Sequence, residues 1–103
     1  MPRTAGSPVS EEVGAELERV AERWRQLPLD QAQSHAAGVR MLIQSLADRV
    51  AEVNGAASAA VPDLGPATMI DQLTVMVYDA SAVPAVAPTS LVADLASLRH
   101  RLA

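Results

Sequence analysis

The chain has 103 residues, which fits a single domain, and its formal net charge is −4 with no run of basic residues. It contains no cysteine, so disulfides, thiol catalysis and cysteine-based metal sites are excluded. The acidic balance argues against a nucleic acid partner. No apolar stretch approaches the ~20 residues that span a bilayer, and the first residues lack the apolar core of a signal peptide. We therefore expect a cytoplasmic protein with no membrane partner.

The expected core is large in residue number but poor in bulk. Half of the residues are hydrophobic, yet the chain holds one Trp, one Tyr and no Phe. Small side chains bury little apolar area, and burial stabilises by about 25 cal/mol per Å². Close helix packing can offset this weakness, and so can a second copy of the chain. The composition therefore favours an oligomer.

The sequence divides into a disordered lead-in, residues 1–8, and a helical domain, residues 9–103. Ser7 as N-cap and Pro8 at the first helical position predict where the first helix begins, and the helix should run to Leu27. Its charged face is expected to be solvated, with weak pairs from Glu16 to Arg19 and from Glu22 to Arg25. The opposite stripe is apolar and comprises Val13, Leu17, Val20, Trp24 and Leu27.

A second, longer helix is predicted from Asp30, as its cap, to Asn54. Pro28 ends the first helix, and the short connection favours an antiparallel hairpin of helices one and two. Gly55, which is free to adopt a left-handed conformation, marks the end. The apolar positions alternate at spacings of four and three, which keeps them on one stripe: Ala32, Ala36, Val39, Ile43, Leu46, Val50 and Val53.

A third helix is expected from about Pro66 to Ala80, after the connection of residues 55–66. It is apolar on most sides, so we expect it to be buried on most sides. The segment from Leu73 to Tyr78 is also β-prone, and pattern alone does not distinguish a short buried strand from a helix. A lone strand would have no partner in this chain, so the helix is preferred.

A fourth helix is predicted after the linker of residues 81–88, capped by Thr89 or Ser90 and running to Leu102. The fold class that follows is all-α: a four-helix, bundle-like single domain, with helices three and four packed across the hairpin. The stripe that the fourth helix contributes to the core is Leu91, Leu95, Leu98 and Leu102.

The residue pattern holds no recognisable chemistry. His35 has no histidine or carboxylate four residues away to form a helical metal pair, and His100 suits the end of a helix. Asp71 and Asp79 lie two turns apart, which is too far to share one ion without further ligands. The Glu-x-x-His motifs of di-metal bundles are missing, and so is a phosphate-binding glycine loop. We therefore predict no enzyme, no cofactor and no metal.

The length of the second helix suggests self-association. At ~1.5 Å per residue it is about 36 Å long, whereas the third and fourth helices span roughly 20–23 Å. Part of the apolar stripe should therefore stay uncovered, which predicts a two-fold homodimer and an interaction module such as an adaptor, regulator or accessory subunit. A protein partner is also possible. The candidate interface residues are Ala37, Gly38, Met41, Leu42 and Leu46.

The alternative function is a small-molecule sensor. Such a protein would hold its ligand in an apolar pocket between helices. Candidate pocket residues are Trp24, the only large aromatic ring system, together with Met69 and Met76.

Overall fold

The computed structural model describes residues 9–103, which form four α-helices and a short 3₁₀ helix. The predicted lead-in of residues 1–8, including Ser7 and Pro8, lies outside the described residues. The helices are α1 (Glu11–Gln26), α2 (Leu29–Val53), α3 (Met69–Ser81) and α4 (Pro88–Leu102), and the 3₁₀ helix η1 (Pro66–Thr68) leads into α3.

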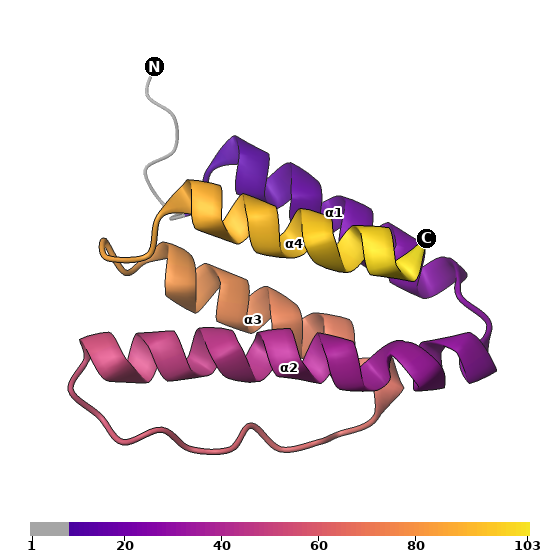
Figure 1. The fold of residues 1–103 in the computed structure, drawn as a ribbon, viewed down its shortest axis with the longest axis horizontal. Helices are drawn as coiled ribbons and strands as arrows, with labels where there is room; N and C mark the ends of the chain where they lie inside the picture. The colour runs from indigo at the N-terminus through magenta and orange to yellow at the C-terminus, as the bar shows by residue number, and fades with distance from the viewer. Residues whose placement is uncertain (1–8) are drawn as a thin grey trace.

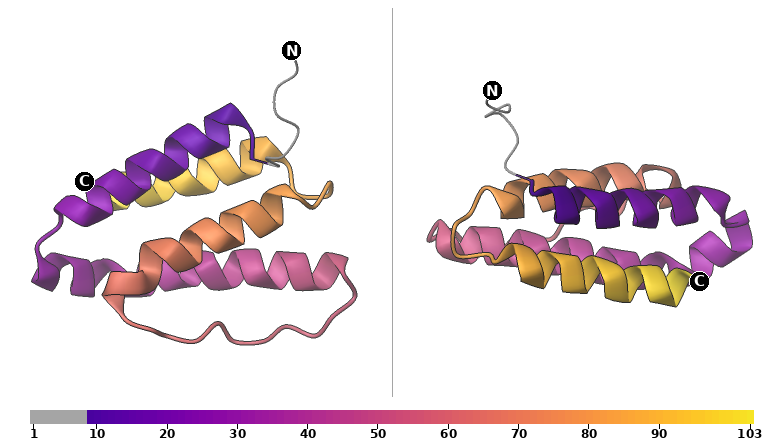
Figure 2. Two further views of the ribbon diagram at one scale, coloured as in Figure 1. Left: turned by 180° about the vertical axis from the view of Figure 1, so that it is seen from behind. Right: turned by 90° about the horizontal axis from the view of Figure 1, so that it is seen from above.

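The helices are arranged as two close pairs, α1 with α4 and α2 with α3 (Figure 1). Within each pair the helices run in the same direction, and the chain reverses direction between α1 and α2 and again between α3 and α4 (Figures 1 and 2). The all-α four-helix prediction is confirmed. The first two helices are adjacent and antiparallel, but each packs mainly against a helix from the second half of the chain.

The long connection after α2 explains this pairing. It runs back along most of α2 before α3 begins (Figure 1). The twelve residues of segment 54–65 can reach about 40 Å when extended, which matches the length of α2. The third helix therefore starts beside the N-terminal half of α2 and runs parallel to it (Figure 1).

Polar side chains hold this connection against α2 and α3. Gln44 Nε2 donates to the carbonyl oxygen of Ala59 at 3.0 Å, and its Oε1 accepts from the Val61 N–H at 2.8 Å. Gln72 Nε2 donates to the carbonyl oxygen of Pro62 at 2.9 Å. Two glutamines thus satisfy backbone groups of a segment that has no secondary structure of its own.

The predicted N-caps of three helices are wrong. The first helix begins at Glu11, where the Ser10 hydroxyl accepts from the Val13 N–H at 3.2 Å and satisfies one of the free donors of the first turn. Asp30 lies inside α2, which begins directly after the extended Pro28. Thr89 and Ser90 lie inside α4, because Pro88 takes the first position, where a missing N–H costs nothing.

Two other predictions of local structure are confirmed. Gly55 adopts φ 69°, the left-handed conformation expected just after the end of α2. The segment from Leu73 to Tyr78 is helical, and Thr74 Oγ1 donates to the carbonyl oxygen of Ile70 at 2.8 Å, one turn back. The β-prone composition is therefore overridden by burial of one face of a helix.

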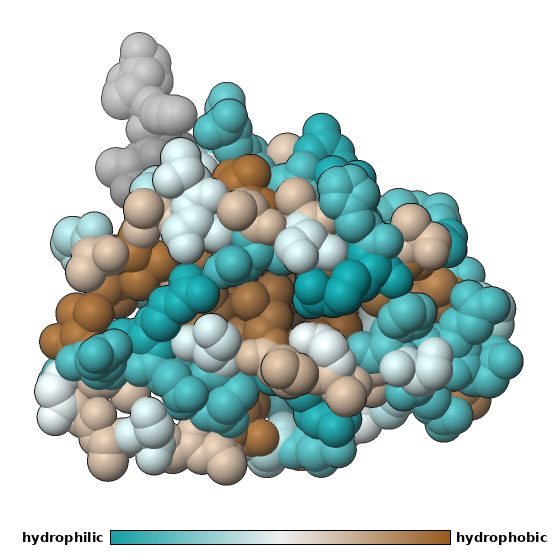
Figure 3. All heavy atoms as spheres, viewed as in Figure 1, coloured by the Kyte–Doolittle hydropathy of each residue, from teal (hydrophilic) through white to brown (hydrophobic). Residues whose placement is uncertain are grey.

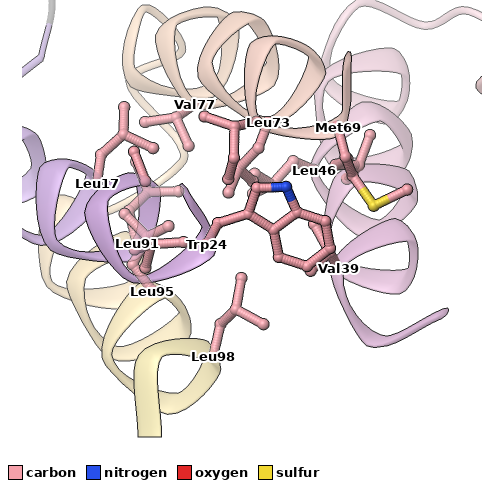
Figure 4. Close-up of a cluster of buried hydrophobic side chains, with 14 of the residues drawn as sticks. Leu17, Trp24, Val39, Leu46, Met69, Leu73, Val77, Leu91, Leu95 and Leu98 are labelled. Carbon is pink, nitrogen blue, oxygen red and sulfur yellow. The ribbon is translucent and has the colours of Figure 1, made fainter. Parts of the chain in front are cut away.

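The core lies between the two helix pairs (Figure 4). All four helices contribute to it, and Leu73, Val77, Leu91 and Leu95 are among its fully buried members. The apolar stripe of α2 is buried from Ala32 to Leu46, and only Val53, at 49% exposure, is clearly open. The part of the stripe that stays uncovered is therefore short, Val53 with the half-buried Val50, since α3 runs alongside α2 and α4 also contacts it.

Candidate functional site

The structure separates the residues predicted to form one interface on α2. Met41 is 73% exposed, and Ala37, one turn earlier, is exposed on the same side of the helix. Leu46 is 1% exposed and belongs to the core. A buried leucine cannot line an open surface, so the predicted set keeps only Met41 and Ala37 as exposed members.

The remaining two predicted interface residues are half-buried. A methyl group placed on Gly38 would lie 4.0 Å from Nε of Arg101, so this glycine faces the end of α4. Leu42 is half-buried and packs against the core. Neither residue is an open part of the predicted interface.

The predicted pocket residues lie in or against packed core. Trp24 and Met69 are buried, and Met76 is half-buried against the core. The indole of Trp24 projects among core side chains that include Val39 and Met69 (Figure 4). Its Nε1 donates to the carbonyl oxygen of Pro66 at 3.2 Å, which ties α1 to η1. Five surface hollows among the described residues are lined by other side chains.

One flank of α1 is closed by polar contacts with α4, and we call this the α1–α4 seam. Glu16 is 8% exposed, and its Oε1 accepts from Nε of Arg99 at 3.0 Å. Arg19 Nη1 donates to Glu16 Oε2 at 2.9 Å, as the predicted pair requires. The solvated position expected for Glu16 is wrong, because Arg99 comes from a helix that the local pattern of α1 does not reveal.

The environment of Glu16 stabilises its charged form. The hydrogen bond from Arg99 lowers the pKa of the Glu16 carboxyl below its ordinary value of 4.5. The positive charges of Arg99 and Arg19 act in the same direction, whereas burial of the carboxyl acts against them. Further along the seam, Arg23 Nε donates to the carbonyl oxygen of Leu102 at 2.8 Å. The contacts at Glu16 and Arg23 join residues far apart in the sequence and fix α4 against α1.

The other flank of α1 is open. Between α1 and α3 lies a hollow of about 420 Å³, the α1–α3 groove, on the face turned toward the viewer in the left panel of Figure 2. Gly14 and Ala21 line it and contribute little side-chain volume, so they do not fill the space between the two helices. The groove is lined by Val9, Gly14, Ala15, Leu17, Glu18, Ala21, Arg25, Ile70, Asp71, Thr74 and Tyr78.

The exposed side of α3 beside this groove carries two apolar side chains. Val75 is 54% exposed and Tyr78 is 44% exposed. They stand three residues apart and so share one side of the helix. Nine of the 13 residues of α3 are buried or half-buried, so the expectation that this helix is buried on most sides holds except on this one side.

The opposite face of the molecule looks different. Over α2 and α4, hydrophilic and weakly polar side chains alternate along the helices, and the strongly hydrophobic residues show mainly in the gaps between them (Figure 3). Arg49 of α2 reaches Asp94 of α4 at 3.0 Å and links the two helices on their outer side. The groove face is therefore the better candidate for a binding surface.

The described residues hold no cluster of three or more His, Asp or Glu side chains that could bind a metal ion. None of the four helices is both long enough and apolar enough to cross a membrane. Comparisons of the chain with models of known protein families, with curated proteins and with solved structures find no match. Function therefore has to be inferred from the surfaces of the molecule.

Proposed function

We propose that this protein is a non-enzymatic protein–protein interaction module, an adaptor, regulator or accessory subunit that binds through its helical faces. Its docking surface is the α1–α3 groove together with the exposed side of α3. The groove offers apolar surface in a concave setting, and helices border it on both sides. This is the form of site into which a partner packs a helix.

One observation carries this proposal: Val75 and Tyr78 are exposed although the core is complete without them. Their neighbours Leu73 and Val77 are fully buried and already anchor α3. A single exposed apolar residue is ordinary in a soluble protein. A pair on one side of a helix, next to a groove with an apolar floor, is a feature that folding alone does not require.

Site-specific photocrosslinking in the cell of origin tests the proposal. A photoreactive amino acid replaces Tyr78 in the groove or Val75 beside it, and Met41 on α2 serves as the matched control because it is also exposed and apolar. We expect one discrete protein adduct from the groove positions, weaker at Met41. The adduct, identified by mass spectrometry, should bind the purified protein and lose that binding in Tyr78→Asp. Uniform adducts at all three positions, or none in the groove, would overturn the proposal.

Self-association stays a separate prediction. The original reason for it, an uncovered stripe on α2, is largely gone, and Met41 with Ala37 is the exposed remainder of the predicted interface. Light scattering at micromolar concentration measures the mass. If the homodimer forms through this side, Met41→Glu should reduce it to a monomer, whereas a monomeric mass for the unmodified protein would rule out the dimer. Leu46→Glu is no test, since it would unfold the core.

A further inference from the structure

The residues that line the α1–α3 groove indicate the chemistry of the partner that it binds. Its floor is apolar and is built from Leu17, Ala21 and Ile70, which belong to the core and are only just covered. Thr74 and Tyr78 of α3 border it on one side. At ~1.5 Å per residue, α3 offers an edge of about 20 Å, which suits three to four turns of a partner helix.

Acidic side chains surround this apolar surface. Glu18 and Asp71 line the groove, and Asp79 lies next to Tyr78 on α3. All three are exposed, and none of their carboxylates has a hydrogen bond or ion pair with another described residue. We call these three residues the acidic rim.

The acidic rim is not neutralised from within the molecule. Arg25 is the one arginine that lines the groove, and its Nη1 lies 3.9 Å from Glu22, so an acidic neighbour already accompanies it. Other acids on the surface are of two kinds: Asp63 lies 3.4 Å from Arg40 and Asp94 lies 3.0 Å from Arg49, whereas exposed acids such as Glu52 are unpaired like those of the rim. The acidic rim therefore places three carboxylates that no arginine pairs with beside the groove and the exposed Tyr78.

We infer that the occupant of the α1–α3 groove is a basic amphipathic helix of another protein. This inference rests on the proposed function, and it adds the chemistry of the partner. The apolar side of such a helix would cover Tyr78, Val75 and the floor of the groove, and its lysines or arginines would meet the acidic rim. Electrostatic complementarity of this kind selects the partner and speeds its association more than it adds raw affinity.

Charge also argues against the other occupants of this surface. A two-fold pairing of the groove face with itself would bring the acidic rims of two copies together, and like charges in contact are unfavourable. Nucleic acid and anionic membranes carry negative phosphates, which the same rim repels. A positively charged protein segment is the occupant that the observed charges favour.

Fluorescence anisotropy with two synthetic peptides tests the inference. The probe is a labelled amphipathic helix of about five turns, with Leu on one side and Lys on the other. The matched control peptide carries Glu in place of every Lys. Both peptides are titrated with the intact purified protein, at low and at high salt, and with four variants whose folding is checked by Trp24 fluorescence.

We expect the Lys peptide to bind and the Glu peptide to bind at least about tenfold more weakly. Tyr78→Asp should lower the affinity for the Lys peptide about tenfold. Met41→Asp, the matched control on α2, should leave this affinity unchanged. The double variant Asp71→Asn, Asp79→Asn should lower the affinity for the Lys peptide about fivefold and make that affinity depend less on salt concentration. Glu52→Gln, which removes an exposed acid far from the groove, should leave binding unchanged.

Three results would overturn the inference: no binding of the Lys peptide, equal binding of the Glu peptide, or equal losses in the groove and control variants. These results are distinguishable from failure of the proposed function. If Tyr78 still yields a discrete crosslinked partner while the Lys peptide does not bind, the interaction module stands and only the basic partner is wrong. If the groove yields no crosslink, the proposed function itself fails.

Discussion

The two flanks of α1 behave in opposite ways. Toward α4, Glu16 and Arg23 make hydrogen bonds with groups 83 and 79 residues away in the sequence, and the α1–α4 seam is closed. Toward α3, Gly14 and Ala21 leave a hollow of about 420 Å³. Both flanks belong to one helix of 16 residues. Side-chain length and charge therefore decide which flank serves folding and which remains available for binding.

Glu16→Gln tests the closed flank and should have the largest effect on stability. The substitution removes the charge that Arg99 and Arg19 meet at 3.0 and 2.9 Å, and a hydrogen bond to a charged group contributes about 2 kcal/mol. Urea unfolding measures the loss. Glu18→Gln is the matched control, because Glu18 is exposed on the open flank, and it should change stability by less than ~0.5 kcal/mol. Equal losses of stability in Glu16→Gln and Glu18→Gln would contradict the difference between the closed and the open flank.

The same carboxylate should make stability depend on pH. Because the folded-state pKa of Glu16 is lowered, its contribution is complete above the ordinary value of 4.5 and is lost as pH falls from there through the lowered pKa. Unfolding experiments on either side of pH 4.5 should therefore show a smaller decline in Glu16→Gln than in the unmodified protein. Glu18→Gln should lose as much stability with falling pH as the unmodified protein. If Glu16→Gln does so too, Glu16 is not the group that makes stability depend on pH.

Gly14→Ala sharpens the description of the open flank. A methyl group at this position would meet Val9 Cγ1 at 3.7 Å, an ordinary contact, and Gly14 has no positive φ. Replacing a helical glycine by alanine should then raise the free energy of unfolding by about 0.5–1 kcal/mol. Thermal unfolding measures the gain. A loss of stability would show that α3 approaches α1 more closely than the groove allows.

Tyr78→Asp should have the smallest effect on stability of the four. Its side chain is 44% exposed, and substitutions at open surface positions usually change stability by less than ~0.5 kcal/mol. Urea unfolding should therefore show near-unchanged stability in the variant that loses peptide binding. A loss of several kcal/mol would mean that Tyr78 supports the fold and not a partner.

The sequence was sufficient for the elements of this fold but not for their pairing. The stripes at spacings of three and four, together with Pro28 and Gly55, identify four helices and most of their ends. Leucines at positions such as Leu91 and Leu95 pack equally well against any apolar stripe, however, so they do not choose a neighbour. The choice depends on contacts between distant residues, such as Glu16 with Arg99, for which local periodicity carries no signal.

The groove could not be predicted for the same reason. Gly14 and Ala21 look like ordinary small residues in a helix, and Val75 and Tyr78 look like part of a buried one. Only the position of α1 relative to α3 shows that these four residues meet at an open surface. The sequence did contain one usable sign, the apolar content of α3 on its outer side, but it was interpreted as burial.

An amide NMR titration with the Lys-bearing helix tests the central claim most directly, since it reports where binding occurs on the intact protein. The account predicts that the largest shift changes fall on the groove residues Gly14, Thr74 and Tyr78, with little change at Met41. Changes centred on α2, or spread evenly over all four helices, would contradict it.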